Sequence, residues 1–358
     1  MKTELRFALI GCGRVSPKHI QALTNLPGVR LVAVCDLDLP KAHHAVKGLH
    51  GIDIFDNYHE MLAKTQLDVV NILTESGSHA DIAVAVAQSG RHVVVEKPMA
   101  LTLPDADRMI STCDRNGVKL FVVKQNRYNL PVIKLHEAVT SGRFGKMVMG
   151  TVRVRWCRPQ AYYDQDAWRG TWAQDGGVFT NQASHHIDLL EWMMGDVETV
   201  FAKAATMLVN TETEDTGVAL LKFTSGALGI IEATTATRPK DLEGSISILG
   251  EKGSVEIAGF AVNEMKTWNF VDAGPEDKGV VEHYRNNPPD VYGFGHLEYL
   301  RGVVDCILNG GKALVDGLEG RRSLELINAI YESAELGKEV RMRFIPRRCK
   351  LGQKSSVL

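Results

Sequence analysis

The first 125 residues alternate short apolar runs with helical patterns. The apolar runs are rich in valine, isoleucine and leucine, which is typical of strands buried on both faces of a parallel sheet. They lie at residues 6–13, 29–36, 68–75, 92–99 and 120–126. Helical patterns separate them at residues 16–26, 58–65 and 79–90. This alternation predicts βαβ units and a doubly wound parallel sheet, an α/β fold.

The pattern changes after about residue 125. Residues 145–156 alternate like one long strand, and residues 183–195 have helical periodicity. Two hairpins are predicted, with turns at Ser225–Gly226 and Lys252–Gly253. The later helical patterns lie at residues 303–310 and 323–337. Long antiparallel strands combined with helices predict a second, α+β domain.

These patterns divide the chain into three parts. Residues 1–125 form the predicted dinucleotide-binding domain, and residues 126–344 the predicted domain for substrate binding and oligomerisation. Residues 345–358 are basic and lack periodicity, so we expect a disordered tail.

Composition narrows the class of protein. The chain has 358 residues, of which 44% are hydrophobic, and its net charge of −2 provides no field that would recruit nucleic acid or an anionic membrane. No apolar run approaches the ~20 residues of a membrane span. Six cysteines without C-x-x-C spacing indicate reduced thiols. We expect a cytoplasmic protein.

A glycine loop follows the first predicted strand. Gly11 and Gly13 lack side chains, so backbone N–H groups can approach a pyrophosphate at a helix N-terminus. Ser16 replaces the third glycine of the usual fingerprint. Asp36 ends the second strand, where a carboxylate accepts ribose hydroxyls and repels a 2′-phosphate, which favours NAD over NADP. The alternative is a plain glycine turn with an exposed aspartate. The loop adds two further candidate cofactor contacts, Arg14 and Val15.

Polar residues also follow three later strands of the predicted sheet, where open α/β sheets bind ligands. The candidate cofactor contacts here are Thr74, His79, Glu96, Lys97 and Asn126. An ammonium and a carboxylate are costly to bury without a role, although Glu96 and Lys97 could also form a purely structural pair. A cis bond before Pro98 is a further possibility.

The glycine-rich start, the "EKP" at residues 96–98 and a downstream histidine helix resemble the Gfo/Idh/MocA oxidoreductases, up to about residue 344. The resemblance implies a Rossmann domain, an open-faced sheet domain, a nicotinamide cofactor and oxidation or reduction of sugar or cyclitol carbons. Five longer motifs are similar to the WlbA-type group of this family, which oxidises C3 of UDP-N-acetylglucosaminuronate for surface polysaccharides such as the lipopolysaccharide O-antigen. They lie at residues 121–129, 156–172, 175–192, 241–255 and 291–296.

The family pattern places an acid four residues before a histidine, and here those positions hold Asn181 and His185. Four residues along a helix bring two side chains onto one face. An amide orients an imidazole but carries no charge, so Lys97 is the first choice for the base, and His185 positions the hydroxyl or shares the proton. We expect His186 to pack or face solvent, and Asp188 to make a scaffold or solvent contact. A simple core histidine is the alternative for His185.

Residues 119–169 contain ten Lys/Arg and three acids, which suggests an anionic substrate such as a nucleotide sugar acid. Arg158 and Arg169 are the preferred candidates, while Arg153 and Arg155 could equally lie on a solvated strand face. In similar proteins the Trp168–Arg169 pair lies near the cofactor. The further candidate substrate contacts are Tyr162, Tyr163, Asn181, Gln182, Tyr292 and His296.

The sequence thus predicts an NAD-dependent dehydrogenase with a small-molecule nucleotide-sugar substrate, and the resemblance implies a homo-oligomer, expected to be a tetramer. Two alternatives stay open: a dehydrogenase of another sugar or inositol, and a non-enzymatic NAD-binding regulator. No His/Asp/Glu set shows metal-ligand spacing, so no metal is expected.

Overall fold

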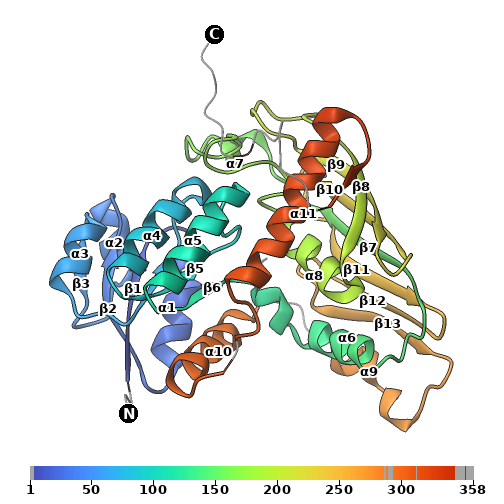
Figure 1. Cartoon of the computed structure of the whole chain (residues 1–358), viewed down its shortest axis with the longest axis horizontal. Helices are drawn as coiled ribbons and strands as arrows, with labels where there is room; N and C mark the ends of the chain where they lie inside the picture. The colour runs from blue at the N-terminus through green and yellow to red at the C-terminus, as the bar shows by residue number, and fades with distance from the viewer. Residues whose placement is uncertain (1–3, 286–287, 289–292, 312, 343–350, 352–358) are drawn as a thin grey trace. The chain divides into compact units, whose positions relative to one another are not determined.

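The computed structural model describes residues 4–285, 288, 293–311, 313–342 and 351. It divides into two compact units (Figure 1). The first unit contains Met1–Gln125 and Gly295–Arg321, and the second contains Asn126–Phe294 and Arg322–Leu358. The predicted tail lies outside the described residues except for Leu351. Within the described part of the chain, no helix is both long and apolar enough to cross a bilayer.

The first unit is built on a parallel sheet with the strand order β3-β2-β1-β4-β5-β6. Its strands are β1 (Leu5–Ile10), β2 (Val29–Cys35), β3 (Asp53–Phe55), β4 (Val69–Ile72), β5 (His92–Val95) and β6 (Leu120–Val122). Its first five α-helices are α1 (Ser16–Asn25), α2 (Leu39–Ala45), α3 (Tyr58–Lys64), α4 (His79–Gln88) and α5 (Leu103–Arg115). This order confirms the predicted doubly wound sheet. Only the three-residue edge strand β3 lacks a counterpart among the predicted strands.

Local sequence explains where these elements begin. The central strands β4 and β5 are buried almost throughout, as expected of strands covered on both faces. Asp38, Asn57 and Thr102 accept backbone N–H groups at the starts of α2, α3 and α5. Such caps satisfy donors that have no partner within the helix.

The first unit also includes a segment that the sequence analysis placed in the second domain. Helix α10 (His296–Leu308) packs on α1, and Asp316 forms a β-bridge with Phe121. At the start of α11 (Gly317–Leu336), a Cβ on Gly317 or Gly320 would approach β6 side chains within 3 Å, so the backbone there lies directly against the sheet. Tertiary contact with α1 and β6 therefore assigns residues 295–321 to the first unit.

The second unit contains an eight-stranded sheet ordered β13-β12-β11-β7-β10-β9-β8-β14. Only the β7–β10 pair is parallel. The strands are β7 (Met147–Arg155), β8 (Val197–Ala205), β9 (Thr216–Phe223), β10 (Leu228–Thr234), β11 (Glu243–Gly250), β12 (Gly253–Ala258), β13 (Glu264–Phe270) and β14 (Val340–Arg341). The helices are α6 (Leu130–Thr140), α7 (Gln160–Tyr163), α8 (Ser184–Met194), α9 (Val280–His283) and the greater part of α11. Both predicted hairpins are present, as β9–β10 and β11–β12, although β12 already begins at Gly253.

The two faces of this sheet differ. Helix α8 packs against β7 and β11, and a Cβ on Gly150 would collide with Leu190 and Met194 of that helix. On the opposite face, Val218 and Leu220 of β9 are at least half exposed. The sheet is therefore mixed and mostly antiparallel, with α8 on one face and solvent-exposed side chains on the other within this unit.

Candidate functional site

The two glycines of the β1–α1 loop are required for different reasons. Gly11 has φ +97°, and a Cβ there would lie 2.7 Å from the carbonyl group of Leu73. Fold geometry alone therefore demands glycine at this position. A Cβ on Gly13 would meet nothing within 4 Å, and its φ is not positive. The open space above Gly13 fits the close approach of a ligand, as a bound pyrophosphate requires.

Asp36, which directly follows β2, forms a hydrogen bond with this loop. Its Oδ2 accepts from the Cys12 amide at 2.7 Å, and its Oδ1 accepts from the Asp38 amide at 2.9 Å. Each carboxylate oxygen keeps a second lone pair that a ribose hydroxyl can use. The ten-residue α1 begins at Ser16 with no acid in its first turn, so its N-terminus is electrostatically suited to an anion. Together, these features fit a dinucleotide.

Thr74 and His79 lie in the loop after β4 and at the start of α4. His79 is buried, with Nδ1 2.9 Å from the Pro98 carbonyl oxygen and Nε2 3.0 Å from that of Thr74. Both ring nitrogens thus contact backbone, so His79 links the loop after β4 to the Lys97–Pro98 segment. The sequence placed it among the cofactor contacts. In the structure both of its ring nitrogens contact backbone carbonyl oxygens of these two loops.

Lys97 follows β5 in a cis Lys97–Pro98 peptide, and its neighbour Glu96 anchors it. The Lys97 amide donates to Glu96 Oε2 at 3.1 Å, while Oε1 lies 3.0 Å from His19 Nε2 and 3.6 Å from His296 Nε2. Burial would raise the pKa of Glu96, but hydrogen bonds and electrostatic interactions with the two histidines hold it well below its usual value. Glu96 is therefore an anion that fixes the backbone next to Lys97.

For His296, closing the substrate pocket and packing were equal expectations, and the structure buries it in this network of the first unit. Local spacing did not predict the cluster, because His19, Glu96 and His296 come from α1, the end of β5 and α10. Their ligand atoms lie within 4.8 Å of one another, a geometry that could also hold a metal ion. Asn71 donates to the second nitrogen of His19 at 2.9 Å, which completes a buried polar network.

In the second unit, Asn181 lies in the turn directly before α8, not within the helix as the spacing suggested. Its side-chain amide donates to Asp175 Oδ1, and Asp175 Oδ2 accepts from the Gly170 amide at 2.8 Å. Asp175 is 2% exposed. The sequence analysis did not single out Asp175, although an acid before two glycines and six residues ahead of Asn181 was a usable signal.

A second buried group holds the same turn. Glu214 accepts the Phe179 amide at 3.1 Å and the Tyr331 hydroxyl at 2.8 Å. Tyr331 in turn receives hydrogen bonds from the Gly177 amide and the Thr180 hydroxyl. Burial raises the pKa of Glu214 to about 7, with a smaller contribution from the charge of Asp175. The backbone of residues 177–180 is therefore fixed independently of Asn181.

Three residues of α8 have different surroundings. His185 is 8% exposed in the first turn of the helix. His186 is buried against the Trp156 ring, and burial lowers its pKa to about 4, so it is a neutral core residue. Asp188 forms a buried, two-bond ion pair with Arg127 at 2.8 Å, the scaffold contact that was one of its two expected roles. Gln182 and Asn126 are also buried.

Four of the predicted contacts form one stack with Trp156. Arg158 Cζ lies 5.2 Å from the Trp156 ring centre and 5.5 Å from that of Tyr162. Arg169 Cζ lies 4.6 Å from the Tyr162 ring centre and 4.4 Å from that of Trp168. Tyr163 is instead buried, with its hydroxyl 3.1 Å from the Thr235 hydroxyl, and burial raises its pKa to about 12. Tyr163 therefore packs. Tyr292 lies outside the described residues.

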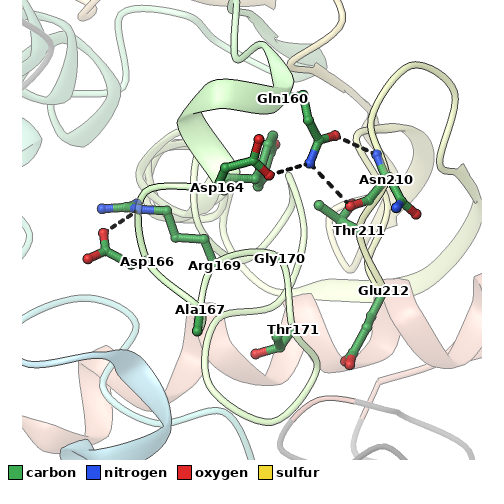
Figure 2. A pocket seen from close by; sticks show the side chains of 11 residues that line it. Gln160, Asp164, Asp166, Ala167, Arg169, Gly170, Thr171, Asn210, Thr211 and Glu212 are labelled. Carbon is green, nitrogen blue, oxygen red and sulfur yellow. Dashed lines mark hydrogen bonds and ion pairs between the residues drawn. The ribbon is translucent and has the colours of Figure 1, made fainter.

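The second unit contains a cavity of about 440 Å³, and Figure 2 shows the side chains that line it. Asp164, Asp166 and Glu212 line it, together with Arg169, which is paired with Asp166 at 2.9 Å. Three carboxylates and one neutralised guanidinium make a poor site for a polyanion. The cavity is therefore unsuited to a diphosphate.

The basic excess of residues 119–169 does not by itself mark an anion site. Arg158 pairs with Asp241 at 2.9 Å, and Arg143 with Asp277 at 2.8 Å. The acids come from a loop and a short 3-10 helix that are distant in the sequence, so counting charges in one segment overstated the local positive field. Arg153 and Arg155, for which a solvated strand face was the alternative, lie on the face of the sheet opposite α8, about a third exposed and paired with the glutamates of β10 and β11.

Comparison with known proteins agrees with this geometry. Residues 5–124 match the oxidoreductase family with an NAD-binding Rossmann fold, and residues 132–256 match the GFO/IDH/MocA C-terminal domain. The WlbA dehydrogenase of Bordetella pertussis, crystallised with NADH and UDP-GlcNAcA, is 45% identical, with a TM-score of 0.92, over 96% of this chain and 99% of its own. The WlbA dehydrogenase of Chromobacterium violaceum, in complex with the same two ligands, is 42% identical, with a TM-score of 0.89, over 96% and 97%.

A curated relative points to another substrate. Myo-inositol 2-dehydrogenase of Thermotoga maritima is 28% identical over 94% of this chain and 98% of its own length. The two family models together match residues of both domains of this chain. The chain belongs to the Gfo/Idh/MocA family, and it is an NAD-dependent oxidoreductase.

Proposed function

We propose that the protein oxidises the C3 hydroxyl of UDP-N-acetylglucosaminuronic acid to a ketone. The likeness to two dehydrogenases crystallised with NADH and UDP-GlcNAcA carries this proposal, because it extends over 96% of the chain at 42–45% identity. The more distant relatives act on inositol or apiose, at 26–28% identity. All of these relatives are dehydrogenases, and a sugar or polyol alcohol is their common substrate class.

The residues of the first unit suit the cofactor half of the reaction. The glycine loop and the N-terminus of α1 would hold the pyrophosphate, and Asp36 the adenosine ribose. When bound, NAD⁺ supplies the acceptor for the hydride that leaves C3. The amine of Lys97 takes the hydroxyl proton, and the Glu96 network keeps the backbone of Lys97 in place for this transfer.

His185 orients the same hydroxyl. Its place in the first turn of α8 fixes its backbone, and the Arg127–Asp188 pair anchors the following turn of that helix. Arg158 and Arg169 hold planar guanidinium groups against aromatic rings and pair with Asp241 and Asp166, so a substrate carboxylate or phosphate would bind here by replacing one of these acids as the partner. Tyr162, between the two arginines, completes this surface.

The test compares substrates on the purified protein. NADH formation is measured with UDP-GlcNAcA, UDP-GlcNAc and myo-inositol, the last representing the inositol alternative. Preferential turnover of UDP-GlcNAcA is expected. Turnover of myo-inositol alone would contradict the proposal and identify the protein as an inositol dehydrogenase. If no sugar or polyol is turned over, the alternative of a non-enzymatic NAD-binding regulator is favoured.

Lys97→Met tests the base. It should abolish turnover, a loss of at least 100-fold in kcat, while the Kd for NADH stays near the wild-type value. Lys97→Arg is the matched control, because it keeps the positive charge but cannot give up its proton at ordinary pH. Equal loss in both variants supports proton transfer, whereas an active Lys97→Met protein contradicts it.

A further inference from the structure

A buried polar network behind Lys97 joins three elements of the first unit. Asn71 belongs to β4 and His19 to α1, while Glu96 directly follows β5. Asn71 and His19 are both 0% exposed, and Glu96 is 7% exposed. Polar and charged groups are costly to bury, and apolar side chains often fill such a space with no loss of stability. The network is therefore expected to serve more than packing.

The hydrogen bonds of this network run in one direction. Asn71 Nδ2 can only donate, so at 2.9 Å it donates to His19 Nδ1, and the proton of the neutral imidazole lies on Nε2. Burial lowers the pKa of His19, which favours this neutral form. His19 Nε2 donates to Glu96 Oε1 at 3.0 Å, and Glu96 Oε2 accepts the Lys97 amide at 3.1 Å. Each oxygen of the carboxylate thus accepts one N–H.

The chain at Lys97 is held at two points. The Glu96 carboxylate accepts its amide, and His79 Nδ1 lies 2.9 Å from the carbonyl oxygen of the next residue, Pro98. The side chain of Lys97 branches from the backbone between these two points. Loss of the first point leaves the second in place, so the loop should stay folded while the direction of the Lys97 side chain becomes less defined.

We propose that His19 is a positioning residue for Lys97, acting through Glu96, and that Asn71 selects the tautomer of His19 that this requires. Without the 3.0 Å hydrogen bond at Oε1, the carboxylate can turn toward His296 of α10, whose Nε2 lies 3.6 Å away, and release the Lys97 amide. The inference rests on the proposed role of Lys97 as the base, but not on which sugar is oxidised.

The test uses two substitutions at position 19 that differ in reach. His19→Gln carries an N–H donor about as far from the backbone as Nε2, whereas the donor of His19→Asn reaches only about as far as Nδ1. The first should keep a hydrogen bond to Glu96 Oε1, and the second should not. His136→Asn is the matched control, because it makes the same change in an imidazole of the second unit that stacks on Trp192.

The direct readout is hydrogen exchange of the Lys97 amide, followed by NMR on protein labelled with ¹⁵N-lysine, with Lys97→Met to assign the signal. The amide of Lys119, which donates to His92 Nδ1, is the internal reference for overall stability. Relative to this reference, exchange should be at least tenfold faster in His19→Asn and near the wild-type rate in His19→Gln and His136→Asn. Equal exchange in wild type and His19→Asn would overturn the proposal.

Turnover gives the second readout. His19→Asn should lower kcat roughly 10- to 100-fold with little change in KM, as is typical when a supporting hydrogen bond is lost, and His19→Gln should recover most of that loss. In a Glu96→Gln background, His19→Asn should cause little further loss, because the path to Lys97 is already interrupted. Additive losses would mean that His19 acts independently of Glu96 and would reject the proposal.

Asn71→Leu serves as the second variant if His19→Asn does not fold. It removes the donor that holds His19 in one tautomer, so the Lys97 amide should exchange faster relative to that of Lys119. Unchanged relative exchange would reject the role of Asn71 and, with it, the path through His19. If the wild type oxidises no sugar or polyol, the proposed function fails while the result for the Lys97 amide stands.

Discussion

The two sheets of this protein use polar side chains in different ways. The strands of the parallel sheet are mostly apolar, apart from residues such as the buried Asn71 of β4, and the candidate cofactor contacts Asp36, Thr74 and Lys97 lie in the loops that follow its strands. The second sheet carries arginines and glutamates in the middle of its strands, on the face opposite α8. A charged residue at a strand end of the first unit is thus a better indicator of a site than one within a strand of the second.

Substitutions in the glycine loop should have the largest effect on unfolding free energy and on NADH binding. Gly11→Ala forces a side chain into a positive-φ position against the backbone of Leu73, so it should cost about 2–5 kcal/mol of unfolding free energy. Gly13→Ala is the matched variant, since its Cβ meets only open space. It should keep stability within about 1 kcal/mol of wild type but weaken NADH binding at least tenfold. Urea unfolding and a fluorescence titration measure the two quantities; equal NADH affinity in wild type and Gly13→Ala would contradict the cofactor assignment.

Glu214 in the second unit provides an effect of intermediate size. Its pKa is raised from 4.5 to about 7, so the folded protein holds a proton that the unfolded chain releases between these values. The contribution of this proton to the unfolding free energy is therefore complete below about pH 4.5, and it is lost as the pH rises to 7. Glu214→Gln removes the titration and should gain up to about 3 kcal/mol relative to wild type between pH 5 and 8.

Glu198→Gln is the control for this pH dependence. Glu198 is exposed and paired with Lys222, which lowers its pKa below 4.5, so it does not titrate in the tested interval. The difference between this variant and wild type should stay constant from pH 5 to 8. A constant difference for Glu214→Gln as well would refute the raised pKa.

Arg155 on the open face should give the smallest effect. It pairs with Glu232 and Glu243, but about a third of each side chain in the Arg155–Glu232 pair is exposed. Arg155→Met should cost at most about 1 kcal/mol, and the cost should shrink in high salt. A loss of several kcal/mol, measured by urea unfolding, would mean that this face is buried in the native assembly and would reduce the contrast between the two sheets.

The sequence predicted the elements whose pattern is local. Five of the six parallel strands, both hairpins and α8 follow from periodicity, and the glycine loop with Asp36 follows from a motif. Strands β3, β8, β13 and β14 were not predicted. Strands β3 and β14 have three and two residues and pair at sheet edges, and β13 is the other edge strand of the second sheet, whereas β8 is a nine-residue interior strand that the sequence analysis missed. Short edge strands depend on tertiary contact more than on their own sequence.

Side-chain partnerships were much less accessible from the sequence. Asp241 and Asp277 neutralise Arg158 and Arg143 from more than 80 residues away, which no window of sequence shows. His296 joins Glu96 only because α10 returns to the first unit. The candidate catalytic residues Lys97 and His185 came from family resemblance, and their roles stay predictions.

The return of residues 295–321 to the first unit has a consequence for biosynthesis. Residues 1–125 leave the ribosome long before α10 is synthesised. The surface of α1 that α10 covers, and the Glu96 side chain that His296 contacts, therefore lack these partners while about 170 further residues are made. The nucleotide-binding unit is thus finished late in translation, and a gene fragment that ends at residue 125 would encode a nascent intermediate of that unit.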